Sequence, residues 1–168
     1  RGVASVAAVT GAVARALDLP VSRVFSSSTG VIGEPLPHER IVGAVPGLVA
    51  ALDGGGLAEA ARAIMTTDTF PKGSHATVEG EGGPIRIAGI AKGSGMIAPD
   101  LATMLVYLFT DATVAPRALQ RMLSACVDDT FNAITVDGDT STSDALLLCA
   151  TGRGPAAPLR GAAAKAFQ

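Results

Sequence analysis

The sequence is poor in aromatic residues and cysteine, and it has no long apolar run. Its 168 residues include no tryptophan, one tyrosine and two cysteines. Cys126 and Cys149 are far apart within apolar stretches, so we expect buried, reduced thiols rather than a disulfide or a metal site. No window holds 18 consecutive apolar residues, and no basic region followed by an apolar one opens the chain. These absences argue against a membrane span and a signal peptide, and indicate a cytoplasmic protein.

Charged and metal-binding residues are also sparse. The net charge of −2 gives no electrostatic reason to expect binding to nucleic acid or to an anionic membrane. The two histidines and two cysteines do not have the spacing of a zinc site. His38 and His75 have no serine or cysteine partner motif, so we expect both to be solvent-exposed and non-catalytic. The loop Asp137–Asp144 has the acidic character of a calcium site, but Thr142 occupies the EF-hand glycine position and no bidentate glutamate follows.

Apolar residues make up 48% of the chain, enough for the core of one domain over residues 1–168. Hydrophobic periodicity predicts helices over 3–18, 37–53 (kinked or split at Pro46), 57–66, 115–132 and from 161 onward. It predicts strands over 21–27, 77–79, 85–91, 103–110 and 145–150. Some strands follow one another directly, which is too irregular for a doubly wound sheet. The predicted fold class is α+β, with helices layered on a mixed sheet.

The most informative stretch is K-G-S-G-M-I-A-P-D-L-A-T-M-L, residues 92–105. Its glycines permit backbone conformations that other residues avoid, and Pro99 restricts φ just before Thr103. Thr103 then opens an apolar, β-favouring run. Cutting the peptide bond before Thr103 would free an α-amine, with a pKa of roughly 7.7–8.0, beside its own hydroxyl. Such an amine can take the hydroxyl proton and so activate an N-terminal threonine as a nucleophile.

This stretch resembles the self-cleavage segment of the ornithine acetyltransferase family, the bifunctional glutamate N-acetyltransferases of arginine biosynthesis. Three further stretches match the family: S-S-T-G-V-I-G at 27–33, I-M-T-T-D-T-F-P-K at 64–72 and F-N-A-I-T-V-D-G-D-T-S-T-S-D at 131–144. One departure is Asp100, where many members have asparagine. Family members are longer and continue to a D-G-E-G-A-T segment that supplies a glutamate of the site. The resemblance therefore implies a central piece, inactive alone, of a longer enzyme with an αββα-like sandwich of the N-terminal-nucleophile class.

The resemblance also implies a role for individual residues. Cleavage between Ala102 and Thr103 would make Thr103 the nucleophile that carries the acetyl group. The Thr29 hydroxyl and the Gly30 backbone N–H would form the oxyanion hole, where one donor typically contributes about 100- to 1000-fold to turnover.

Thr66 and Lys92 would bind the substrates, and Lys92 would do so by pairing with a substrate carboxylate. In a ping-pong reaction N-acetylornithine would acylate Thr103, and glutamate would then take the acetyl group. No cofactor is implied, although some members also use acetyl-CoA. The cleaved halves would stay associated, in a larger oligomer.

Two alternatives remain open. The first is an aminopeptidase or amidase of the same architecture, although such relatives usually carry serine at the position of Thr103 and lack the S-S-T-G-V-I-G block. The second is a non-catalytic ligand-binding or assembly domain, in which Thr103 is an ordinary strand residue and Thr66, Thr67 and Asp68 only cap a helix end. Acetyl transfer to glutamate separates transferase from hydrolase, and an intact bond before Thr103 in the mature protein would favour the non-enzyme.

Overall fold

The computed structural model describes residues 2–31, 33–94, 103–134 and 141–168. The described residues up to Leu57 form one compact unit, and those from Ala58 onward form a second. Helices in both units and a mixed four-stranded sheet in the second confirm the α+β class.

The N-terminal unit consists of two helices that pack against each other, α1 (Gly2–Ala16) and α2 (His38–Ala50). The helix predicted over 37–53 continues through Pro46 without splitting, although a proline there removes the backbone hydrogen bond to the carbonyl of Val42. The strand predicted over 21–27 was wrong. Residues Val21–Arg23 form the 3-10 turn η1, in which Val24 N–H donates to Val21 O at 3.0 Å.

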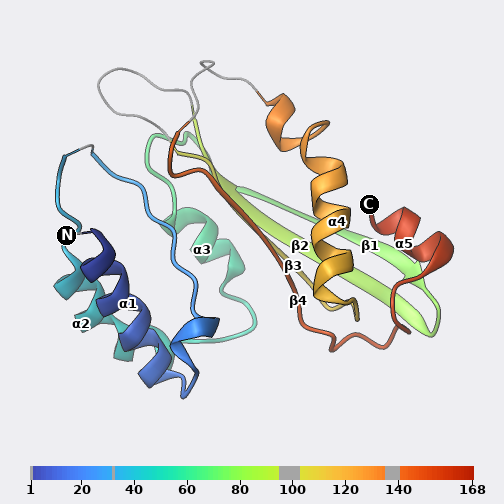
Figure 1. Cartoon of the computed structure of the whole chain (residues 1–168), viewed down its shortest axis with the longest axis horizontal. Coiled ribbons are helices and arrows are strands. Elements are labelled where there is room, and N and C mark those ends of the chain that lie inside the picture. The colour runs from blue at the N-terminus through green and yellow to red at the C-terminus, as the bar shows by residue number, and fades with distance from the viewer. Residues whose placement is uncertain (1, 32, 95–102, 135–140) are drawn as a thin grey trace. The chain divides into compact units, whose positions relative to one another are not determined.

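The second unit contains a sheet with strand order β1-β2-β3-β4, shown edge-on in Figure 1. Its strands are β1 (Lys72–Gly80), β2 (Gly83–Lys92), β3 (Leu105–Thr110) and β4 (Ala145–Ala150). The β1–β2 and β2–β3 pairs are antiparallel, while β3 and β4 are parallel. A parallel pair needs a crossover connection, which contains α4 (Pro116–Val127) and the short turn η2 (Phe131–Ala133). The strands predicted at 77–79 and 85–91 do follow one another directly, and the first of them extends over nine residues.

Helices cover one face of this sheet (Figure 1). Alternate residues of the sheet, including Ile87, Leu108 and Leu148, line an apolar pocket together with Leu123 and Val127 of α4. Two shorter helices complete the unit: α3 (Leu57–Ala63) precedes β1, and α5 (Gly161–Phe167) contacts β1.

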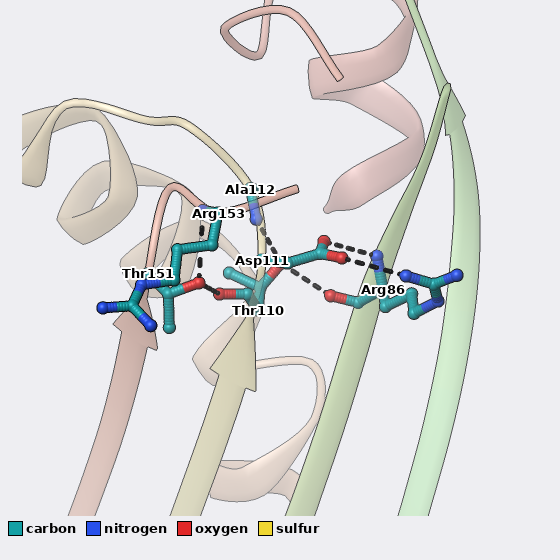
Figure 2. Close-up of polar contacts among 6 residues, drawn as sticks. All are labelled: Arg86, Thr110, Asp111, Ala112, Thr151 and Arg153. Atoms are coloured by element: carbon teal, nitrogen blue, oxygen red, sulfur yellow. Dashed lines mark hydrogen bonds and ion pairs between the residues drawn. The ribbon is translucent and has the colours of Figure 1, made fainter. Parts of the chain in front are cut away.

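Polar contacts hold the strands in register at the end where β3 stops (Figure 2). Asp111 Oδ1 accepts the N–H of Arg86 at 2.8 Å, and Thr110 Oγ1 donates to the carbonyl of Arg86 at 2.8 Å. Thr151 Oγ1 donates to the carbonyl of Thr110 at 3.3 Å, which joins β4 to the same network. These groups bind one another across three strands, so this end of the sheet has a structural role.

Two predictions about reactive side chains were wrong in part. Both cysteines are free, but Cys149 is exposed and Cys126 half-buried. Strand alternation in β4 places Cys149 on the face opposite Leu148, away from α4. His38 is also half-buried, with its Nδ1 at 3.1 Å from Ser5 Oγ, whereas His75 is exposed as predicted, within β1 rather than in a loop.

No helix among the described residues is long and apolar enough to cross a membrane.

Candidate active site

The opposite end of the sheet, where β3 begins, gathers three of the four sequence blocks that carry the family resemblance. Lys92 ends β2 and pairs with Leu105, the first residue of β3, which in turn pairs with Ala145 of β4. Residues just before β3 and just before β4 therefore meet at one edge, because the two strands are parallel. Lys72, the first residue of β1, pairs with Ala91 and adds the 64–72 block to the same edge.

Lys92 is a buried cation at this edge. Its side chain is 1% exposed, and Nζ donates a hydrogen bond to Thr66 Oγ1 at 2.7 Å. Burial lowers the pKa of Lys92 below its ordinary value, the charge of Asp68 opposes this shift, and Lys72 adds to it. A buried ammonium has three donors to satisfy and binds a carboxylate strongly, because little water competes. The position of Lys92 therefore suits recognition of an anionic group.

Asp68 joins the 64–72 block to the end of β2. Its side chain is fully buried, Oδ1 accepts from Lys72 Nζ at 2.5 Å and from Gly93 N–H at 2.8 Å, and Oδ2 accepts Thr66 N–H at 3.2 Å. Burial raises the pKa of Asp68, but the hydrogen bonds from Lys72, Gly93 and Thr66 outweigh it and lower that pKa to about 2. Asp68 therefore stays ionised and holds the backbone on both sides of the Lys92–Thr66 contact.

The backbone at position 93 favours glycine over residues with a side chain. Its φ is +151°, and a Cβ at this position would lie 3.4 Å from the Cα of Met104. The glycine thus lets the chain leaving β2 pass close to Met104, which follows Thr103 on the chain entering β3.

Replacing Asp68 with asparagine should make the free energy of unfolding depend less on pH in the acid range. Because the folded-state pKa is about 2 and the ordinary value is 3.8, Asp68 stabilises the fold above about pH 4 and loses this contribution as the pH falls toward 2. We expect the wild-type free energy of unfolding to fall by about 2 kcal/mol more than that of Asp68→Asn between pH 6 and 2. Urea unfolding of the full-length protein across this range measures the difference. The exposed Asp129→Asn should behave as wild type, and equal acid losses in Asp68→Asn and wild type would contradict the prediction.

Thr103 is held by the segment that leads into β4. It is 3% exposed, and its Oγ1 lies 2.8 Å from Ser141 Oγ. Two backbone hydrogen bonds fix the adjoining chain: Met104 N–H donates to Asp144 Oδ1 at 2.8 Å, and Ala145 N–H donates to Met104 O at 3.0 Å. Strand alternation continued back from Leu105 assigns Thr103 to the sheet face that carries Lys92.

The structure brings together three of the predicted site residues, Thr66, Lys92 and Thr103, at one sheet edge. Thr29 is half-buried and Gly30 exposed, and both lie in the N-terminal unit, in the segment between η1 and α2. The other side of the predicted cleavage point, Ala102, lies outside the described residues, as do Asp100 and the first half of the rejected calcium loop, residues 137–140.

Sequence reasoning missed three residues of this edge. Asp68 was interpreted only as a local cap; it does accept the nearby Thr66 N–H, but it also reaches Gly93, 25 positions away. Ser141 and Asp144 were assigned no role of their own, only membership of a polar loop that, by the resemblance, flanks the active site. The available signal was their position: both lie within four residues of the start of the strand predicted at 145–150. Within the ranges the structure describes, no group of three or more histidine, cysteine, aspartate or glutamate side chains could hold a metal ion.

Comparison with known proteins decides the family. All of residues 1–168 match the model of the ArgJ family. The chain belongs to the ArgJ family. It is 68% identical over 151 residues to the arginine biosynthesis bifunctional protein ArgJ of Ruegeria pomeroyi, an overlap of 90% of this chain and 37% of that protein. The ArgJ protein of Gluconobacter oxydans is 57% identical over 141 residues, 84% of this chain and 33% of that protein.

These matches confirm the family resemblance predicted from the four sequence blocks. The chain spans only about a third of the length of the curated ArgJ relatives that it matches.

Proposed function

We propose that the protein containing this chain transfers the acetyl group of N-acetylornithine to glutamate through an acetyl ester on Thr103, after cutting itself between Ala102 and Thr103. The observation that carries the proposal is the buried Thr103 hydroxyl at the same sheet edge as the buried Lys92 ammonium. The names of the ArgJ relatives, which place them in arginine biosynthesis, support the same conclusion.

The proposed chemistry needs one nucleophile and one cation. Cleavage frees the α-amine of Thr103, which accepts the proton of the threonine hydroxyl as its oxygen attacks the acetyl carbon. Ornithine then leaves, and the amine of glutamate attacks the resulting ester. Donor and acceptor each carry an α-carboxylate, so Lys92 can hold both in turn and orient both half-reactions. Thr29 and Gly30 are the proposed donors to the oxyanion of each tetrahedral intermediate.

We also propose that residues 1–168 form part of one αββα-like sandwich in a longer enzyme, as the resemblance implies. The sheet face opposite α4 supports this, because it is apolar in part and not covered throughout: Phe109 is 40% exposed and Cys149 is exposed. A second sheet packed on this face would bury these side chains. The same proposal includes cleaved halves that stay associated in an oligomer, a cytoplasmic location, no cofactor, and acetyl-CoA only as an alternative donor.

The test uses the full-length protein purified from its own host. Intact mass spectrometry should show two fragments, the second beginning at Thr103 and gaining one acetyl group when N-acetylornithine is added without glutamate. Added glutamate should remove that acetyl group and appear as N-acetylglutamate. Release of free acetate without transfer would favour the hydrolase instead, and a single uncut chain without an acetyl adduct would exclude both enzymes.

A further inference from the structure

Among the residues that the structure describes, Ser141 contacts the Thr103 hydroxyl. The family resemblance assigns Ser141 no role. The two oxygens lie 2.8 Å apart although the residues are 38 positions apart in the chain. We propose that Ser141 is a second catalytic hydroxyl, which orients Thr103 Oγ1 and donates a hydrogen bond to that oxygen when it leaves the acetyl group. This inference rests on the proposed function and deepens its second half-reaction.

The hydrogen bonds of Ser141 leave its proton available to donate to Thr103. A hydroxyl has one proton to donate and two lone pairs to accept with. One lone pair of Ser141 Oγ accepts the N–H of Ser143 at 3.1 Å, which leaves the proton and one lone pair for Thr103. With Thr103 as a free hydroxyl, either oxygen can donate. Once Thr103 carries an acetyl group its oxygen has no proton, so only Ser141 can be the donor.

The surrounding structure holds the two oxygens in place. Ser141 lies four residues before β4 and Thr103 two residues before β3, and the parallel pairing of these strands brings their first residues side by side. Asp144 binds Met104 N–H at 2.8 Å, which anchors the chain between Ser141 and β4 directly next to Thr103. With Thr103 only 3% exposed, little water can replace the Ser141 hydroxyl as a donor.

The balanced step is the transfer to glutamate. The glutamate amine forms a bond to the acetyl carbon, and the bond from that carbon to Thr103 Oγ1 breaks. The electron pair of the broken bond returns to Oγ1, where the Ser141 O–H stabilises the developing negative charge. The nitrogen loses one proton, which the α-amine of Thr103 accepts and passes to Oγ1, so the Thr103 hydroxyl is restored. Ser141 keeps its own proton throughout.

The test compares Ser141→Ala, Ser141→Thr and the matched control Ser143→Ala in the full-length protein. Ser143 has an exposed side chain, and its backbone N–H is retained in alanine. Rapid-quench measurements separate acetylation by N-acetylornithine from deacetylation by glutamate, with rates expressed per cleaved molecule as counted by intact mass. We expect Ser141→Ala to slow deacetylation roughly 10- to 100-fold, since a hydrogen bond to a charged group is lost. The KM for glutamate should stay within about twofold and acetyl-enzyme should accumulate.

Ser141→Thr, which keeps the hydroxyl, should restore most of the rate, and Ser143→Ala should match wild type. Wild-type deacetylation in a folded Ser141→Ala, or equal losses in Ser141→Ala and Ser143→Ala, would overturn the proposal. If Ser141→Ala does not fold, Ser141→Cys preserves the shape with a weaker donor and should show the slow deacetylation; a wild-type rate there would also overturn it. Failure of the wild-type protein itself to form acetyl-Thr103 would refute the proposed function instead.

Discussion

Replacing Thr103 with alanine is expected to leave a single uncut chain and to lower acetyl transfer at least ~10⁴-fold. In the proposed function one hydroxyl serves both events: it attacks the preceding carbonyl during self-cleavage and the acetyl carbonyl during transfer. Alanine removes this oxygen, and without cleavage the α-amine base is also absent. Denaturing electrophoresis and intact mass measure the cleavage, and formation of N-acetylglutamate measures the transfer.

Two variants control for packing. Thr103→Ser keeps the nucleophilic oxygen and should still cut and transfer. Thr110→Ala removes another threonine hydroxyl with the same 3% exposure, at the opposite end of β3, where it belongs to the network in Figure 2. This variant should lose stability but remain cleaved and active. Cleavage before residue 103 in Thr103→Ala would contradict the assignment of the nucleophile.

Replacing Lys92 with methionine is expected to lower kcat/KM for both N-acetylornithine and glutamate by roughly 100- to 1000-fold, the range for removing one partner of a buried charged pair. Methionine fills a similar volume, and burying an apolar side chain in place of a cation avoids its desolvation. The loss should therefore fall on substrate binding and orientation rather than on folding. Steady-state kinetics on the cleaved, full-length protein provide the measurement.

An analogue lacking the carboxylate makes this test specific. Wild type should discriminate strongly against the decarboxylated donor N-acetyl-1,4-diaminobutane, whereas Lys92→Met should treat the two donors alike. Lys165→Met, at an exposed position of α5, is the matched control and should behave as wild type. Undiminished preference for the carboxylate in Lys92→Met would show that another group binds it.

Prediction from the sequence succeeded where local pattern decides structure. β4 begins and ends at the predicted residues, and α1 differs from its prediction by one residue at its N-terminal end and two at its C-terminal end. The prediction failed over 21–27, where β-favouring residues form a turn, because strand propensity needs a partner strand and the donors here bind their own segment. It also failed for Cys149, since an apolar run does not reveal which of its alternate residues face the helices.

The sequence by itself determined the family, and it supplied the predicted nucleophile and the two predicted substrate-binding residues, since each lies in a contiguous block whose order along the chain is distinctive. Only the tertiary structure decided how those blocks meet. The contacts Asp68–Gly93, Lys92–Thr66 and Thr103–Ser141 join residues 25 to 38 positions apart. They depend on the register of paired strands, and a shift of one residue would turn every side chain of a strand to the other face. Register arises from long-range pairing and burial, and no local stretch of the chain contains that information.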